Sequence, residues 1–329
     1  MKVVYLGSGE FGIECLNALG SSSHSLDFIV TQPAQPAGRG RRLRPTPVAR
    51  WAKERAIAFI DPDDVNTPDV VGRIAQFRPD LIVAVAFGQK IGNELITLPP
   101  KGAINVHASL LPKYRGAAPI NWAIINGETQ TGVSIICLAE KMDAGDILAQ
   151  AKTDIGTDET AGQLHDRLAR LAAPLLLKTL DQIVGGNALY ARQDHSTATL
   201  APKLKKSDGC LDFSQPAEKL RNRIRGLWPW PGASAIYVSK ETAKSCRVTI
   251  AAADAIEHSN PSRLHVGTFD ENLHVVCGNN ALKITGIKPA GCSLMDFNAF
   301  VNGRHSRPGD LLVNVGCEPS SALEHTQDP

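Results

Sequence analysis

Short apolar runs alternate with amphipathic stretches along the first half of the chain. An apolar run bounded by glycine, proline or charged residues predicts a buried strand, whereas apolar residues three and four positions apart predict a helix. The predicted strands cover residues 2–6, 26–30, 81–86, 103–107, 131–138 and 147–153. The predicted helices cover residues 7–19, 47–56, 69–77, 119–126 and 160–184. This alternation predicts an α/β fold with a doubly wound, mostly parallel sheet of the Rossmann-like kind.

The pattern changes after about residue 188. Residues 193–207 are rich in Ser, Thr, Pro and Lys and show little periodicity, which is typical of a linker. A helix is predicted over residues 217–225, and short β-like runs at 235–238, 246–251, 273–277 and 282–287 predict a smaller β-barrel domain. The predicted organisation is a domain over residues 1–188, a linker over 189–207, the barrel over 208–315 and a flexible tail over 316–329.

The most informative chemistry lies at the end of the predicted strand 103–107. Asn105 and His107 are two positions apart and so share one face of a strand. His107 also lies at the carboxyl end of that strand, where ligands bind in open α/β sheets. With Asp143 from the loop after residue 138, these residues supply the amide, imidazole and carboxylate that acyl transfer needs. Taken singly, His107 could be a structural histidine and Asp143 a turn residue, with Asp146 as a competing carboxylate.

The segment N-x-H-x-S-L-L-P-x-Y-R-G-x-x-P over residues 105–119, with the later D-x-G over residues 143–145, resembles the active-site signature of enzymes that use 10-formyltetrahydrofolate as formyl donor. The resemblance implies that Asn105, His107 and Asp143 are the catalytic trio. It implies 10-formyltetrahydrofolate as a co-substrate, no metal, and an OB-like barrel at the C-terminal end. It also implies that four successive residues line the folate site, namely Ser109, Leu110, Leu111 and Pro112.

Four arginines gather in a stretch rich in glycine and proline, at Arg39, Arg41, Arg42 and Arg44. Arginines in such a loop suit phosphate and base-edge contacts, although charge runs are usually only solvated surface. The stretch resembles the P-A-G-R-G loop of the methionyl-tRNA formyltransferases, which enters the acceptor stem of initiator tRNA, and its arginine falls on Arg39. We therefore predict that these arginines bind tRNA. Two further basic patches could continue an RNA track, at Lys203, Lys205 and Lys206 and at Arg221, Arg223 and Arg225.

Composition narrows the class of protein further. Hydrophobic residues make up 43% and charged residues 21% of the chain, and the net charge is only +2, so overall charge does not point to nucleic acid. No apolar run reaches the length of a membrane span. Seven cysteines without C-x-x-C pairs argue against structural zinc and against a disulfide framework. Because the strand pattern begins at Lys2, we expect no signal peptide, and we expect a cytoplasmic protein without a membrane or obligate protein partner.

The function expected from the resemblance is formyl transfer from 10-formyltetrahydrofolate to the α-amino group of methionine on initiator tRNA, for translation initiation. The alternative is an N-formyltransferase that acts on an amino-sugar nucleotide with the same trio. Two further hypotheses are an enzyme that formylates glycinamide ribonucleotide and an RNA-binding module on a formyltransferase fold that has lost its activity. Gly7-x-Gly9-x-x-Gly12 also matches a dinucleotide fingerprint, but the second strand ends without the acidic residue that such a site needs. We interpret these glycines as a tight strand-to-helix turn, and Trp228–Gly232 as packing between a helix and the barrel.

Overall fold

The computed structural model describes residues 1–37, 40, 42–258 and 264–315, and the chain divides into two units. The first unit comprises residues 1–119, 130–154 and 164–202, and the second comprises 120–129, 155–163 and the chain from residue 203. Within the described part of the chain, no helix is both long enough and apolar enough to cross a membrane.

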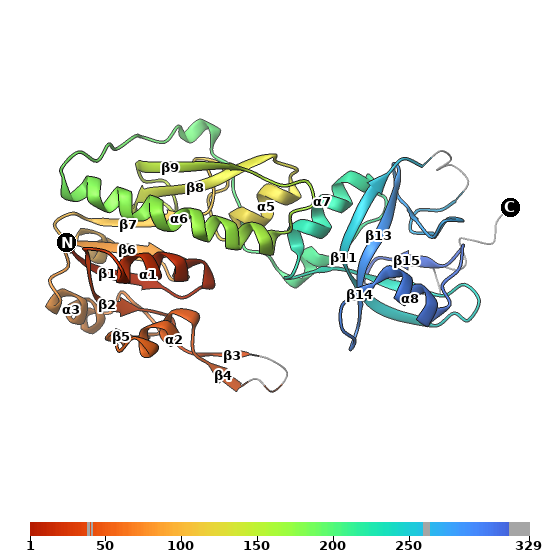
Figure 1. Ribbon diagram of the computed structural model, residues 1–329, viewed down its shortest axis with the longest axis horizontal. Coiled ribbons are helices and arrows are strands. Elements are labelled where there is room, and N and C mark those ends of the chain that lie inside the picture. Colours follow the sequence, from red (N-terminus) through yellow and green to blue (C-terminus); the bar gives the residue numbers. More distant parts are fainter. Residues whose placement is uncertain (38–39, 41, 259–263, 316–329) are drawn as a thin grey trace. The chain divides into compact units, whose positions relative to one another are not determined.

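A seven-stranded sheet forms the centre of the first unit (Figure 1). Its strands, in their order across the sheet, are β5 (Phe59–Ile60), β2 (Ser25–Val30), β1 (Lys2–Gly7), β6 (Leu81–Val85), β7 (Ala103–His107), β8 (Gln130–Cys137) and β9 (Ile147–Asp154). The strands from β5 to β7 are parallel, and β8 and β9 pair antiparallel at one side. The central strands β1 and β6 are buried, which explains their unbroken apolar sequences. The predicted doubly wound, mostly parallel sheet is thereby confirmed.

Helices alternate with the strands, and the periodicity predicts each of them except the short helix over residues 93–97. They are α1 (Ile13–Gly20), α2 (Pro47–Glu54), α3 (Pro68–Gln76), α4 (Asn93–Thr97), α5 (Pro119–Ile125) and α6 (Ala161–Val184). The start of α2 shows the local cause clearly. The Thr46 hydroxyl accepts a hydrogen bond from the Ala49 N–H at 3.0 Å, and Pro47 occupies the first turn, where its missing N–H costs nothing.

The glycine motif after β1 serves the packing of Tyr5. That ring is fully buried, and its hydroxyl donates to the Gly12 carbonyl at 3.1 Å. A methyl group at Gly7 or at Gly12 would collide with the Tyr5 side chain, and at Gly7 also with the Val85 carbonyl. The requirement for small residues therefore comes from the strand-to-helix turn itself, in agreement with the interpretation from the sequence.

The second unit contains an antiparallel sheet that is nearly closed into a barrel. Its strands run in the order β12 (Val275–Val276), β13 (Ala281–Pro289), β11 (Ser245–Ile256), β10 (Ala233–Val238) and β15 (Leu311–Val313), and β14 (Met295–Asp296) pairs with β13. Bridges from Thr268 to Leu311 and from Phe269 to Val275 link the two ends of this order. Aromatic side chains fill the centre, and Tyr237 and Phe300 meet edge to face with ring centroids 5.2 Å apart. The predicted barrel-like domain is confirmed.

Two helices accompany the barrel, α7 (Ala217–Leu227) and α8 (Phe297–Arg304). The sequence pattern predicts α7 but not α8, β14 or β15. In the first unit it also misses a hairpin of β3 (Gln35–Ala37) and β4 (Arg42–Arg44). The predicted tail over 316–329 lies outside the described residues.

Candidate active site

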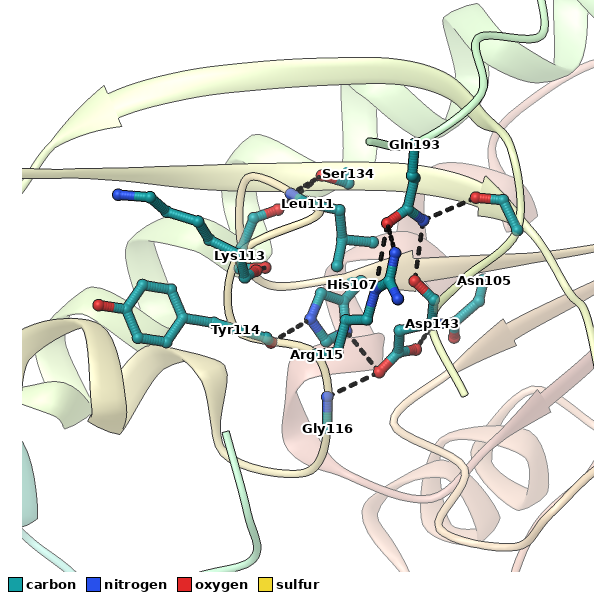
Figure 2. A network of polar contacts seen from close by, with 12 residues as sticks. Asn105, His107, Leu111, Lys113, Tyr114, Arg115, Gly116, Ser134, Asp143 and Gln193 are labelled. Atoms are coloured by element: carbon teal, nitrogen blue, oxygen red, sulfur yellow. Dashed lines mark hydrogen bonds and ion pairs between the residues drawn. The ribbon is translucent and has the colours of Figure 1, made fainter. Parts of the chain in front are cut away.

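Strand β7 and the loop between β8 and β9 bring the three predicted catalytic residues together (Figure 2). Asn105 and His107 lie on β7, and the Asp143 side chain from the loop faces both. The Asn105 amide Nδ2 is 3.4 Å from Asp143 Oδ1, and His107 Nδ1 is 3.6 Å from Asp143 Oδ2. The side chains of His107 and Asp143 are 6% and 11% exposed, so an amide, an imidazole and a carboxylate share one poorly solvated site.

A backbone carbonyl sets the orientation of the His107 ring. His107 Nε2 lies 2.9 Å from the Tyr114 carbonyl, which can only accept, so Nε2 carries a proton. The other nitrogen, Nδ1, then faces Asp143, and its distance of 3.6 Å is longer than a hydrogen bond. Among the described residues, Nδ1 is therefore the ring nitrogen without a hydrogen-bond partner, and it faces the carboxylate.

The Asp143 carboxylate is held by a second backbone group. The Gly116 N–H donates to Asp143 Oδ2 at 2.8 Å. Gly116 has a φ of 122°, and a Cβ at that position would lie 2.6 Å from the Ala201 carbonyl oxygen. Only glycine fits this turn without strain, which gives a physical reason for the Arg-Gly pair that ends the signature's Y-R-G.

Gln193 holds the backbone of the Asp143 loop, and sequence reasoning missed it. Its amide Nε2 donates to the Asp143 carbonyl at 2.8 Å and to the Gly145 carbonyl at 2.7 Å. Its Oε1 accepts from Arg115 Nε at 3.2 Å and Nη2 at 2.6 Å. Gln193 is only 6% exposed. Asp143 itself has a φ of 52°, a left-handed conformation that aspartate adopts more readily than most residues, and these bonds help to hold the loop in it.

The Ser109–Pro112 loop is shaped by hydroxyl and amide side chains beneath it. The Ser109 hydroxyl donates to the Lys113 carbonyl at 2.7 Å. The Ser134 hydroxyl donates to the Ser109 carbonyl at 2.6 Å and accepts from the Leu111 N–H at 3.0 Å. Gln150 Nε2 donates to the Leu111 carbonyl at 3.0 Å. These bonds fix a loop that leaves the sheet directly after β7.

The four residues expected to line the folate site differ in accessibility. Ser109 and Leu111 are buried, and the Ser109 hydroxyl is engaged within the loop. Leu110 and Pro112 are half-buried. The accessible apolar surface of this loop is therefore supplied by Leu110 and Pro112, whereas Ser109 and Leu111 determine its shape.

The thiol of Cys137, at the end of β8, is not a candidate nucleophile. Burial raises its pKa, and the nearby Asp146 carboxylate raises that pKa further. The thiol therefore stays protonated near neutral pH, and a protonated thiol is a poor nucleophile. Among the residues that the structure describes, no group of three or more His, Cys, Asp or Glu side chains could hold a metal ion.

The predicted tRNA-binding arginines lie partly on the β3–β4 hairpin. Arg42 and Arg44 are exposed and, two positions apart on β4, share a face. Arg39 and Arg41 lie outside the described residues.

The three arginines of α7 are engaged inside the second unit. Arg221 pairs with the Asp158 carboxylate at 2.5 Å, and Arg223 donates to the Asp208 carbonyl. Arg225 donates to the Gly156 carbonyl at 3.1 Å. These guanidinium groups have structural partners already, which weakens their assignment to an RNA track.

Comparison with known proteins decides the family. Residues 1–180 match the family described as "Formyl transferase", and residues 203–305 match "Formyl transferase, C-terminal domain". The chain belongs to the formyl transferase family. It is 39% identical to the methionyl-tRNA formyltransferase of Geobacter sulfurreducens over 317 residues, which cover 96% of this chain and 98% of the relative. It is 38% identical to the methionyl-tRNA formyltransferase of Moorella thermoacetica, with 96% and 100% covered.

Solved structures share the fold of this formyl transferase. WlaRD, a sugar 3N-formyl transferase solved in the presence of dTDP and 5-N-formyl-THF, superposes with a TM-score of 0.61 at 14% identity, covering 89% of this chain and 99% of WlaRD. HypX from Aquifex aeolicus, in complex with tetrahydrofolic acid, superposes with a TM-score of 0.57 at 17% identity, covering 92% and 47%. At such identities the likeness concerns the fold alone.

Proposed function

We propose that this formyl transferase moves the formyl group of 10-formyltetrahydrofolate to the α-amino group of methionine esterified to initiator tRNA. The observation that carries the proposal is the meeting of Asn105, His107 and Asp143 at the end of β7. The substrate assignment rests on the relatives named methionyl-tRNA formyltransferase, which align with 96% of the chain.

The reaction is a direct transfer between two nitrogens. The neutral amine of the methionyl group attacks the formyl carbon, and the carbonyl electrons move to the oxygen to give a tetrahedral oxyanion. Collapse of this intermediate breaks the bond from the formyl carbon to N10, which leaves with its electron pair. The amine loses one proton and N10 gains one, so formylmethionyl-tRNA and tetrahydrofolate leave with no net uptake of protons.

Asn105 and His107 stabilise the oxyanion. Asn105 Nδ2 makes only a long contact with Asp143, so its amide hydrogens are available to the developing charge. His107 Nε2–H is engaged by the Tyr114 carbonyl, so His107 acts through a proton at Nδ1. Preorganised donors of this kind contribute about 3–4 kcal/mol each to transition-state stability in other acyl-transfer sites.

Asp143 carries the proton from the incoming amine to the N10 leaving group. Its Oδ2 faces His107 Nδ1 at 3.6 Å, which leaves the carboxylate close enough to stabilise an imidazolium without a direct hydrogen bond. The Gly116 N–H keeps this carboxylate in place while it accepts and returns the proton. Leu110 and Pro112 offer apolar surface for the pterin ring beside the trio, and this surface fits the flat, partly apolar donor.

The arginines at 39–44 recognise the acceptor stem of the tRNA. Arg42 and Arg44 present two exposed guanidinium groups on one face of the β3–β4 hairpin, a geometry suited to phosphates and base edges. Arg39→Ala should therefore reduce the ratio of initiator to elongator tRNA formylation. An unchanged ratio would remove the loop from substrate recognition.

One assay tests the proposal as a whole. Formyl transfer from 10-formyltetrahydrofolate is measured side by side on charged initiator tRNA, charged elongator methionine tRNA and an amino-sugar nucleotide. Formylation confined to initiator tRNA is the expected result. Formylation of the sugar alone would keep the trio and overturn the substrate, and no transfer to any acceptor would overturn the trio as a working site.

A matched pair of carboxylate variants tests the choice between the two aspartates of this loop. Asp143→Asn removes the charge that faces His107 and should lower kcat by about 100-fold, the range for loss of a general acid–base group. The Asp146 side chain does not contact Asn105 or His107 in the described structure, so Asp146→Asn should retain near-normal turnover. The opposite ranking would transfer the catalytic role to Asp146.

A further inference from the structure

A pocket of about 420 Å³ opens on the barrel of the second unit, and none of the residues assigned above to catalysis or to the folate site lines it. The residues that line it and matter for its chemistry are Lys206, Trp230, Ser234, Arg247 and Thr249. The proposed function leaves this pocket unused.

The strand alternation of β10 and β11 builds the floor of the pocket. Val248 and Ile250 belong to the barrel core, so Arg247 and Thr249 between and beside them face outward. Ser234 on β10 is the register partner of Thr249. Two hydroxyl-bearing residues therefore form a polar floor on the outer face of the barrel.

The rim of the pocket carries one aromatic ring and two cations. The Trp230 side chain is 53% exposed, which differs from the packing role that the sequence indicates for this segment. Lys206 and Arg247 are exposed, and within the described part of the chain neither side chain has an ion pair or a hydrogen bond. Among the described residues, no carboxylate lines the pocket.

The cations of this pocket, Lys206 and Arg247, differ from the arginines of α7 in their partners. The arginines of α7 already donate hydrogen bonds to carboxylates and carbonyls of the same unit, so part of their binding capacity is already used. Lys206 and Arg247 have no such partner among the described residues. An aromatic face beside unpaired cations is the arrangement by which proteins hold a base and its phosphate.

We propose that this pocket binds one unpaired nucleotide of the RNA substrate, with the base stacked on Trp230 and the phosphate between Lys206 and Arg247. The inference rests on the proposed function, because it takes the tRNA as the ligand. A volume of about 420 Å³ lies in the range of small-ligand sites and is too small to admit a duplex. A purely apolar ligand would leave Lys206 and Arg247 without a partner. A ligand that offered only phosphate groups would make no use of the Trp230 ring.

The test measures the affinity of the full chain for uncharged tRNA by fluorescence anisotropy. Trp230→Ala should weaken binding about 10-fold, the order expected for one stacked base, and Trp230→Phe should restore most of it. The double variant Lys206→Ala with Arg247→Ala should also flatten the dependence of log K on log salt by about two units. Lys244→Ala is the matched control, since this exposed lysine of the same barrel does not line the pocket.

The outcomes separate failure of the pocket from failure of the proposed function. Loss of binding in Trp230→Ala, with rescue by Trp230→Phe and an unchanged unfolding midpoint, supports stacking. Wild-type affinity in Trp230→Ala, or equal loss in both Trp230 variants, overturns it. A short single-stranded oligonucleotide serves as a second probe. If the enzyme formylates no tRNA but still binds the oligonucleotide through Trp230, the proposed function fails and the pocket stands.

Discussion

Replacement of Gln193 by alanine is the most informative single perturbation of the active site. Gln193 touches no reacting group, yet its amide holds the carbonyls of Asp143 and Gly145 and its oxygen receives the Arg115 guanidinium. The substitution leaves the catalytic trio chemically intact. It removes only the contacts that keep the Asp143 backbone in its left-handed conformation.

The magnitude follows from the number of groups left without a partner. Two carbonyls and one guanidinium group lose a hydrogen bond in a site where Gln193 is only 6% exposed. At about 1 kcal/mol for each group, the free energy of unfolding should fall by about 3 kcal/mol. The released loop lets the Asp143 carboxylate move away from His107, and a displacement near 1 Å at a catalytic group can cost about 100-fold in rate.

The assay compares kcat, the KM for charged tRNA and the unfolding midpoint among three variants. Gln193→Ala should lower kcat by 10- to 100-fold, on the order set by misplacement, and leave the KM for tRNA nearly unchanged. Gln193→Glu should lower kcat at least as much as Gln193→Ala, because it places a carboxylate oxygen against the carbonyls of Asp143 and Gly145. Gln182→Ala is the control, since the Gln182 side chain on α6 makes no hydrogen bond within the described structure. A Gln193→Ala enzyme with wild-type kcat would refute the argument.

Three further predictions follow from individual contacts. Asn105→Ala should lower kcat by about 100-fold or more, the cost of one oxyanion donor, while tRNA affinity measured by filter binding stays constant; a proportional loss of affinity would indicate misfolding instead. Gly116→Ala should destabilise the fold by about 1–3 kcal/mol in thermal unfolding, because a Cβ would press on the Ala201 carbonyl at a positive φ, whereas Gly72→Ala on α3 meets no atom within 4 Å and should be neutral or stabilising. Burial and the hydrogen bond to Asp310 raise the pKa of Tyr237 from 10.0 to about 12. The neutral phenol therefore contributes stability that is complete below pH 10 and is lost as the pH rises toward 12, and a Tyr237→Phe chain that shows the same alkaline loss would contradict this assignment.

The centre of the first unit could be predicted from the sequence because its central strands are buried on both faces. Strands such as β1 and β6 are continuous apolar runs between turn signals, so their positions follow from hydrophobic pattern alone. The pairing of Asn105 with His107 follows from the period of a strand. The β3–β4 hairpin carries no such pattern, since its strands contain proline, glutamine and arginine and are exposed where described.

The contacts that orient the trio were not predictable from the sequence. A backbone carbonyl orients the His107 ring, and a backbone N–H orients the Asp143 carboxylate. Nearly every residue type carries both backbone groups, so the amino-acid sequence does not reveal these contacts. Gln193 is fifty positions from Asp143 in a stretch without periodicity, and its amide resembles any surface glutamine until the chain is folded. The sequence therefore predicts which side chains form the candidate site, but it does not predict the contacts that orient them.

Segment 193–201 belongs to the active site although it reads as a linker. Besides the Gln193 contacts, the Arg115 N–H donates to the Thr199 carbonyl at 2.8 Å and the Ala201 N–H donates to the Arg115 carbonyl at 2.7 Å. These bonds hold the signature loop at Arg115, directly before Gly116, and the Gly116 N–H in turn holds the Asp143 carboxylate. A change in this segment should therefore lower turnover before it affects the barrel, because the hydrogen bonds that connect the segment to the Asp143 loop all lie within the first unit.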